Sequence, residues 1–168
     1  DNNPGTRDVD GLANRKQLQY AITQWAMDEA LDLGPDRALT LYMMDHGDYD
    51  KLYLNTRADQ VSPEEINEWL EILEAARPGV RVNVIVEACL SGSFIDPSKS
   101  LSKPGRVVIT SSSNASNAYA SREGGAHFSD TFVQALEQEM SLYSAFADAQ
   151  EVANSWHPDQ MAWLDDNG

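Results

Sequence analysis

The stretch VNVIVEACLSGS, residues 82–93, decides the fold. Its first half is a β-branched apolar run, which is typical of a buried strand, and its second half places small polar residues around the single cysteine, Cys89. Two comparable runs flank it, at residues 38–44 and 106–110. The first runs into Asp45-His46-Gly47-Asp48, and the second runs into a serine-rich segment. We therefore predict three buried strands, each followed by small or polar residues.

Helical patterns separate these strands. Apolar residues recur at helical spacing over residues 14–33, until Gly34-Pro35 ends the run. Ser62, Pro63 and Glu65 form the start signal of a second helix, with a capping box. Two more helices are expected over residues 128–140 and 142–156, and a short hairpin at 51–54. Strands that alternate with helices predict an α/β fold, a three-layer α-β-α sandwich around a mostly parallel sheet.

Composition sets the broad class. The chain has 168 residues with 12 basic and 27 acidic side chains, a net charge of −15. An acidic surface repels nucleic acid and anionic lipid, so we expect neither as a partner. No apolar run approaches the roughly 20 residues that a membrane span requires, and one cysteine permits neither an internal disulfide nor a CxxC metal site. We expect an exposed lead-in over residues 1–13, one domain over 14–157 and an acidic tail over 158–168.

His46 and Cys89 both follow the carboxyl end of a predicted strand. Parallel strands place such positions at one edge of the sheet, where α/β proteins bind ligands. A cysteine attacks a carbonyl group as thiolate, and His46 is a suitable base, with the amides of Gly47 and Cys89 as donors to an oxyanion. The alternative is a buried structural cysteine and an unrelated histidine. His127 and His157 lack such contexts, and we interpret both as ordinary surface or core residues. The alternative for His127 is a place at the edge of the site, because it follows Gly124-Gly125 near the start of a predicted helix.

Two sequence blocks resemble a known family. Asp45-His46-Gly47 and EACLSGS, residues 87–93, are similar to the signature blocks of the legumain family of cysteine endopeptidases, peptidase family C13 of the caspase-like clan CD. A third block, residues 107–119, resembles the strand and loop that wall its specificity pocket. The resemblance implies a caspase-like fold and hydrolysis of a protein or peptide substrate through an acyl-enzyme on Cys89, with His46 as acid and base.

The same resemblance implies roles in substrate specificity. Glu87 would line the S1 pocket, with Asp45 beside it, and Arg15 would balance its charge while Asn14 orients His46. We predict Asn at P1, which is favoured if Arg15 reaches Glu87. The alternative, if no cation reaches Glu87, is Arg or Lys at P1, as in clostripain-like members. Three serines are candidate wall residues: Ser112, Ser113 and Ser116.

Other interpretations stay open at this point. The same acyl-enzyme supports a transpeptidase or ligase, and a caspase-like pseudoenzyme would instead be a binding module of a surface protein. No metal-ligand motif is present, so no catalytic cofactor is expected. Structural calcium at Asp8 and Asp10 or at Asp165 and Asp166 is a hypothesis. A secreted or cell-surface prokaryotic location, and processing from a larger precursor, are expectations from the family.

Overall fold

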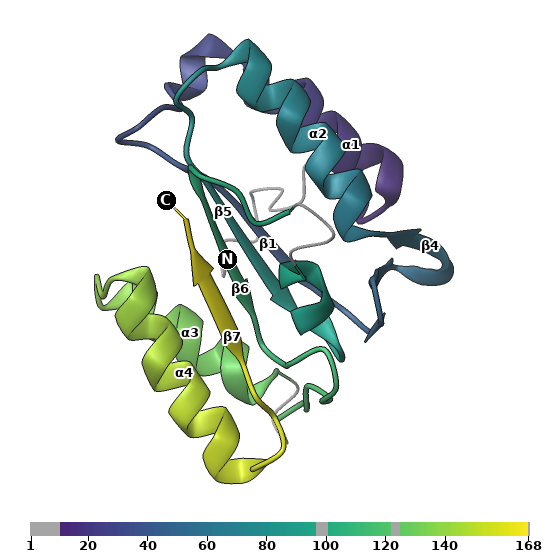
Figure 1. Ribbon diagram of the computed structural model, residues 1–168, viewed down its shortest axis with the longest axis vertical. Helices are drawn as coiled ribbons and strands as arrows, with labels where there is room; N and C mark the ends of the chain where they lie inside the picture. Colours follow the sequence, from purple (N-terminus) through teal and green to yellow (C-terminus); the bar gives the residue numbers. More distant parts are fainter. Residues whose placement is uncertain (1–10, 97–100, 122–124, 168) are drawn as a thin grey trace, which may run out of the picture.

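A four-stranded sheet forms the centre of the computed structural model, which describes residues 11–96, 101–121 and 125–167. Its strands lie in the order β1 (Leu39–Met44), β5 (Val82–Glu87), β6 (Arg106–Thr110) and β7 (Trp163–Asp166). The first three are parallel and β7 is antiparallel to β6 (Figure 1). The prediction of a mostly parallel sheet is confirmed.

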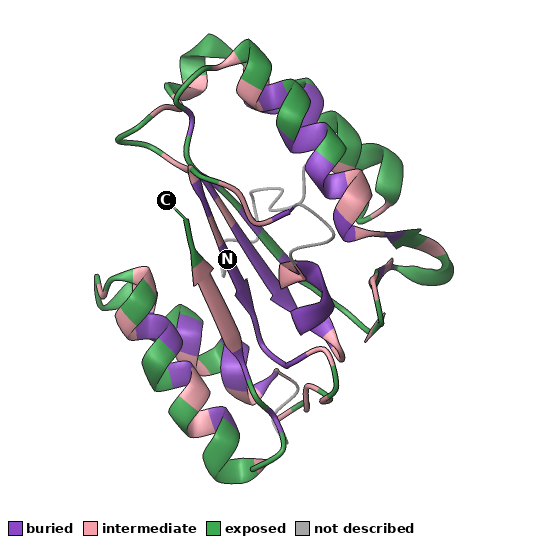
Figure 2. Cartoon of the chain, in the orientation of Figure 1, coloured by how far each residue is buried: buried purple, intermediate pink, exposed green. Residues whose placement is uncertain are grey.

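Helices cover both faces of this sheet. α1 (Arg15–Thr23) and α2 (Pro63–Ala76) lie on one side, and α3 (His127–Glu137) and α4 (Leu142–Trp156) lie on the other. Alternate strand residues therefore enter two separate hydrophobic cores. Figure 2 shows β5 and β6 mostly buried between the two layers of helices. Val84 belongs to the core under α1 and α2, whereas its neighbour Ile85 packs against α3 and α4. This is the three-layer sandwich that the sequence predicts.

The start of α2 matches its sequence signal. The Ser62 side chain accepts a hydrogen bond from the Glu65 amide, and the Glu65 side chain accepts one from the Ser62 amide. Pro63 occupies the first turn, where its missing N–H costs no hydrogen bond.

The helix expected over residues 14–33 is shorter than its apolar spacing predicts. α1 ends at Thr23, and two short 3₁₀ turns follow, η1 (Trp25–Met27) and η2 (Glu29–Leu31). α1 ends where Gln24 leaves the helical conformation, with φ −130° and ψ −59°. Asp28 then separates the two turns, because its backbone is extended and its side chain accepts a hydrogen bond from the Ala30 amide. A side chain that caps a new turn competes with continuation of the helix.

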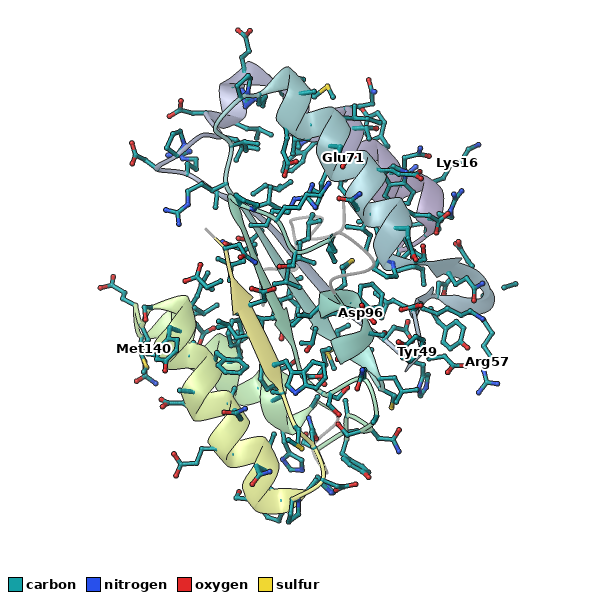
Figure 3. All side chains as sticks on the ribbon, in the orientation of Figure 1. Lys16, Tyr49, Arg57, Glu71, Asp96 and Met140 are labelled. Atoms are coloured by element: carbon teal, nitrogen blue, oxygen red, sulfur yellow. The ribbon has the colours of Figure 1, made fainter. Side chains whose placement is uncertain are left out.

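A second, smaller sheet follows β1. It contains β2 (Gly47–Asp48), β3 (Lys51–Leu54) and β4 (Thr56–Val61), which confirms the hairpin expected at 51–54. The Asp50 amide donates to Ser93 Oγ at 3.0 Å, and the Tyr49 hydroxyl lies 3.5 Å from an Asp96 oxygen (Figure 3). These contacts fasten the small sheet to η3 (Ser91–Ile95), the turn that follows Cys89.

The chain's C-terminal segment is a strand of the main sheet, which corrects the expected acidic tail over 158–168. Asp165 and Asp166 of β7 pair with Val108 and Val107 of β6. This edge strand was missed because only Trp163 and Leu164 are apolar and two aspartates follow them. Its side chains are mostly half-buried. Residues 1–10 of the expected lead-in over 1–13 lie outside the described residues, and residues 11–13 are exposed. Within the described ranges, we find no helix with the length and apolarity that crossing a membrane requires.

Candidate active site

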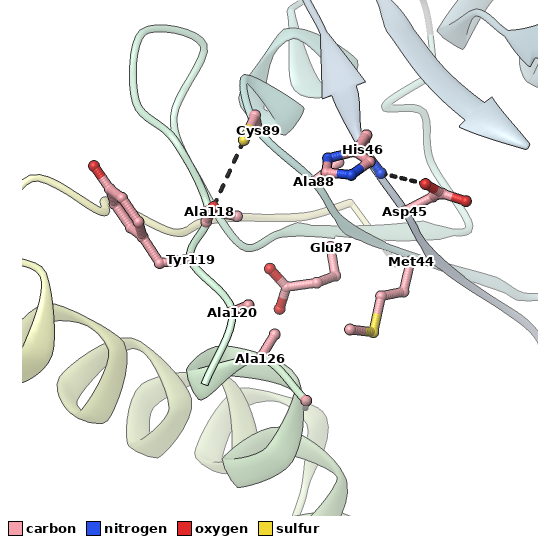
Figure 4. Close-up of a pocket in the computed structure, with 11 residues that line it drawn as sticks. Met44, Asp45, His46, Glu87, Ala88, Cys89, Ala118, Tyr119, Ala120 and Ala126 are labelled. Atoms are coloured by element: carbon pink, nitrogen blue, oxygen red, sulfur yellow. Dashed lines mark hydrogen bonds between the residues drawn. The ribbon is translucent and has the colours of Figure 1, made fainter. Parts of the chain in front are cut away.

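The carboxyl ends of β1 and β5 form one pocket. Met44 pairs with Glu87 at the end of the parallel register, so His46 and Cys89 each lie two residues beyond the same level of the sheet. Both line a pocket of about 270 Å³ (Figure 4). Its other lining residues come from β1, β5 and the chain before α3: Met44, Asp45, Glu87, Ala88, Ala118, Tyr119, Ala120, Gly125 and Ala126. The strand order thus brings the histidine and the cysteine together, as predicted.

Cys89 lies at a sharp turn. Leu90 adopts a left-handed conformation with φ 57°, which is uncommon for a residue with a side chain, and its amide donates to the Ser116 carbonyl at 2.9 Å. The half-buried Cys89 thiol donates to the Ala118 carbonyl, with 3.6 Å between sulfur and oxygen. The sulfur therefore faces the pocket wall, and the described residues include no hydrogen bond between Cys89 and His46. Such a contact often forms only when substrate binds.

His46 is exposed on the opposite side of the pocket. Its amide donates to Asp45 Oδ1 at 2.6 Å, and its carbonyl accepts from the Tyr53 amide at 3.0 Å. The next residue, Gly47, lies against the Cys89 segment: a Cβ at this position would stand 2.7 Å from the Cys89 carbonyl oxygen and 2.8 Å from Ala88 Cβ. Both separations are too short for a side chain, so a glycine is required for the two strand ends to approach this closely.

Glu87 is buried at the base of the pocket, with 3% of its surface exposed. Its Oε2 accepts two hydrogen bonds from Ser129, one from the amide at 3.1 Å and one from the hydroxyl at 2.8 Å. The Tyr42 hydroxyl in turn donates to Ser129 Oγ at 2.6 Å. Glu87 Oε1 is buried without a hydrogen-bond partner among the described residues.

The charge around Glu87 is acidic. Burial raises the pKa of the Glu87 carboxyl, the nearby Ser111 hydroxyl and the donors of Ser129 oppose that rise, and the Asp130 carboxylate adds to it. Asp130 lies directly behind the pocket wall, because a Cβ on Gly125 would stand 2.1 Å from Asp130 Oδ1. Among the described lining residues there is no Lys or Arg. The pocket therefore offers acceptors and negative charge to a ligand.

Arg15 does not form the predicted pair with Glu87. Its guanidinium is hydrogen-bonded to Glu65 and lies 5.6 Å from the centre of the Trp69 ring, so it belongs to the contact between α1 and α2. Asn14 does not orient His46, because its side chain accepts from the Gln17 amide as the N-cap of α1. Both residues serve the start of a helix, where capping and charge pairing fix their side chains.

The predicted wall serines lie behind the pocket rather than along it. Ser112 is fully buried, and its hydroxyl donates to the Ala88 carbonyl at 2.8 Å. Its oxygen also accepts from the Ser91 amide at 3.1 Å, while Ser113 bonds to Ser116 at 2.9 Å. These hydroxyls fasten the serine-rich segment to the turn that carries Cys89, so their role is positional.

The wall itself consists of residues 118–120. Tyr119 is held by three contacts: its amide donates to Gln160 at 3.2 Å, its hydroxyl donates to Asp159 at 3.0 Å, and its ring stacks on His157 at 4.0 Å. Two alanines complete this wall, and sequence reasoning missed them because small apolar residues give no chemical signal. It also missed Tyr42 and Ser129, although a hydroxyl in an apolar strand and another at a helix start were visible signs.

The calcium hypothesis is not supported by a ligand cluster in the parts of the chain that the structure describes, where no three metal-binding side chains converge. Asp165 is hydrogen-bonded to Ser102 and to Asn167. Asp8 and Asp10 lie outside the described residues, so calcium binding there stays a prediction.

Comparison with known structures defines the class of fold. The chain is similar to caspase-1 from Spodoptera frugiperda, with a TM-score of 0.62 and 12% sequence identity, over 89% of this chain and 66% of that chain. It thus spans slightly less than two thirds of the caspase chain. At this identity the likeness establishes a caspase-like α/β fold.

The family follows from the sequence model of the peptidase C13 family, which matches residues 19–163. The chain belongs to the peptidase C13 family, as its two signature blocks indicated. A search of curated proteins found no match.

Proposed function

We propose that this chain is a cysteine endopeptidase that uses Cys89 and His46. The observation that carries the proposal is the single pocket that both residues line, with the buried Glu87 carboxyl at its base. Membership of the peptidase C13 family supports it. The substrate would be a protein or peptide whose P1 side chain enters the pocket toward Glu87.

The proposed reaction has two stages. His46 takes the proton from the Cys89 thiol, and the sulfur attacks the carbonyl carbon of the scissile peptide bond. The amides of Gly47 and Cys89 would stabilise the oxyanion, and His46 would protonate the leaving amine as the C–N bond breaks. Water then attacks the acyl-enzyme with His46 as base, which releases the acid and regenerates the thiol. For this to begin, the sulfur must leave the Ala118 carbonyl that it now contacts.

We infer that the pocket favours Arg or Lys at P1. The sequence favoured Asn at P1 on the condition that Arg15 compensates Glu87, but Arg15 is bound to Glu65 instead. A cationic P1 side chain would supply the missing countercharge to Glu87, and Asp130 behind the wall strengthens that attraction. The net charge of −15 also favours the approach of basic peptides.

Asn at P1 is the second candidate, and one observation favours it. Burial raises the pKa of Glu87, so its neutral form is favoured relative to an exposed carboxyl. A neutral carboxyl donates one hydrogen bond and accepts another, which matches a side-chain amide. The two candidates therefore differ in the protonation state of one residue.

A panel of fluorogenic peptides with Arg, Lys, Asn or Asp at P1 tests the proposal. We expect turnover after Arg and Lys that disappears in Cys89→Ala and His46→Ala. Turnover after Asn with none after Arg or Lys would overturn the basic specificity and retain the peptidase. Product that incorporates an added amine would indicate a transpeptidase or ligase. Folded protein that cleaves no peptide in the panel would favour the pseudoenzyme.

We extend the proposal to a secreted or cell-surface location and to release from a larger precursor. Both are supported by the resemblance to legumain-like enzymes alone. Adding calcium and a chelator to the same assay tests whether calcium has a structural role.

A further inference from the structure

The two oxygens of the Glu87 carboxyl have different surroundings. Oε2 accepts both the amide and the hydroxyl of Ser129, at 3.1 Å and 2.8 Å. Oε1 is equally buried but has no hydrogen-bond partner in the described parts of the chain. Ser111 Oγ is also buried and unpaired there; it lies near the carboxyl without the geometry of a hydrogen bond. One oxygen is thus fixed, and the other is left for a donor.

The fixed oxygen is connected to a third residue. Tyr42 on β1 donates to Ser129 Oγ at 2.6 Å, and its ring lies 6.2 Å from that of Phe132 on the same helix as Ser129. Burial raises the pKa of the Tyr42 hydroxyl to about 12, so Tyr42 keeps its proton at any pH at which a peptidase is assayed. A donor of this kind polarises the Ser129 hydroxyl and strengthens the next bond in the series.

Resting on the proposed function, we propose that Ser129 and Tyr42 are positioning residues of the specificity pocket. Their hydrogen bonds in series hold Glu87 Oε2 against α3 and thereby present Oε1 to a cationic P1 side chain. Neither residue needs to touch the substrate for this role, and neither lines the pocket. Without the series, the carboxyl would be free to rotate, and its two oxygens would compete for donors.

The hydrogen bonds to Glu87 also make the binding of basic substrates dependent on pH. The groups that face Glu87 are Tyr42 from β1, Ser111 after β6, and Ser129 and Asp130 from α3, while Asp45, His46 and Cys89 share its pocket. Donation from Ser129 favours the charged carboxylate, because an N–H or O–H donor interacts more strongly with an anion than with a neutral carboxyl. Removing a donor therefore raises the pKa of Glu87 and shifts the acid limb of activity on basic substrates to higher pH.

Two variants test the series. Tyr42→Phe removes only the hydroxyl and keeps the ring against Phe132. Ser129→Ala removes the hydroxyl donor to Glu87 and keeps the backbone amide donor. For a Lys substrate we expect KM to rise several-fold in Tyr42→Phe and about tenfold in Ser129→Ala, with kcat changed less than about twofold, since charge-assisted hydrogen bonds have that range of strength. Tyr143→Phe, on the exposed face of α4, is the matched control and should leave both constants unchanged.

Nuclear magnetic resonance separates this inference from the proposed activity. Titration of ¹³C-labelled Glu87, with Glu87→Gln to assign its signal, is expected to show a higher pKa in both variants than in the wild type. Ser129→Thr retains a hydroxyl and should restore the wild-type titration. If the Glu87 titration and the KM are unchanged in both variants, or if kcat falls while KM does not, the positioning role is wrong. If no peptide is cleaved, the titration still decides it.

Discussion

The two ends of the central sheet differ in how fully the protein compensates a buried charged side chain. At the amino end of β6, Arg106 is 0% exposed, and its guanidinium binds both oxygens of Glu74 at 2.6 Å and 2.8 Å. Its remaining nitrogen donates to Asn67 at 3.0 Å and to the Leu101 carbonyl at 2.9 Å. At the carboxyl end of β5, one oxygen of Glu87 accepts two hydrogen bonds. Among the described residues, those that shift the pKa of Glu87 include no cation.

This difference in compensation indicates a structural role for Arg106 and a substrate-binding role for Glu87. Removing a charge from water is costly unless partners replace the water, and the Arg106 cluster replaces nearly all of it from within the fold. Glu87 receives only part of that compensation. A closed ion pair holds α2 on the sheet, whereas an incompletely paired carboxyl at a pocket is suited to a partner that arrives with the substrate.

The largest effect is expected from the nucleophile itself. Cys89→Ala should reduce kcat/KM by at least about 10³-fold, because the acyl-enzyme cannot form. Its thermal midpoint should change little, since the Cys89 thiol makes one weak hydrogen bond in the described structure. Peptide turnover and differential scanning calorimetry on the same preparation measure both quantities. Retained turnover would exclude Cys89 as the nucleophile.

At the opposite end of the sheet, Arg106→Met should act on stability instead. It leaves the buried oxygens of Asn67 and Leu101 without their donor, and we expect a loss of about 3–5 kcal/mol of unfolding free energy. Urea denaturation checks this value. Lys103→Ala, which removes an exposed pair with Glu71, is the control and should have little effect. Equal effects of the two variants would contradict the contrast between buried and exposed pairs.

Glu87→Gln should separate the effect of Glu87 on stability from its effect on substrate preference. Because the pKa of Glu87 is raised in the folded state, its contribution to stability is fully present below its unfolded pKa and is lost as pH rises through the folded pKa. At pH 7 the neutral glutamine is therefore expected to be more stable by about 1 kcal/mol, and at pH 4 the difference should vanish. Cleavage after Arg or Lys should fall about tenfold or more.

Chemical denaturation at the two pH values, together with the P1 panel, checks both expectations. A variant that loses stability at pH 7 would mean that charged Glu87 is already compensated within the protein.

The smallest effect is expected for Arg15→Ala. The pair of Arg15 with Glu65 is partly exposed, so its loss should cost less than about 1 kcal/mol, and the P1 preference should stay that of the wild type. Thermal unfolding and the peptide panel measure the two. A switch in P1 preference would show that Arg15 reaches Glu87 after all, against the geometry described above.

Much of the fold was predictable because its signals are local. The capping box at Ser62, the β-branched run of β5 and the strand-end positions of His46 and Cys89 each follow from short stretches of sequence. The parallel pairing of β1 with β5 then places the last two together.

The partners of Glu87 were not predictable in the same way. Ser129 and Tyr42 are 87 residues apart, and their contact depends on how α3 packs against β1. Arg15 had the right charge for Glu87, yet its place on α1 directs it to Glu65. Tertiary packing decides such pairs, and a single sequence does not encode it in any short pattern.

Gly47 explains physically why a glycine follows the histidine in the Asp45-His46-Gly47 block. The backbone of Cys89 and the methyl group of Ala88 occupy the space where a side chain of residue 47 would lie. The glycine therefore sets the shortest separation between the two strand ends. In a saturation library at this position we expect glycine to be the only residue recovered. In related sequences, a larger residue at the equivalent place would indicate that the histidine and the cysteine are held farther apart.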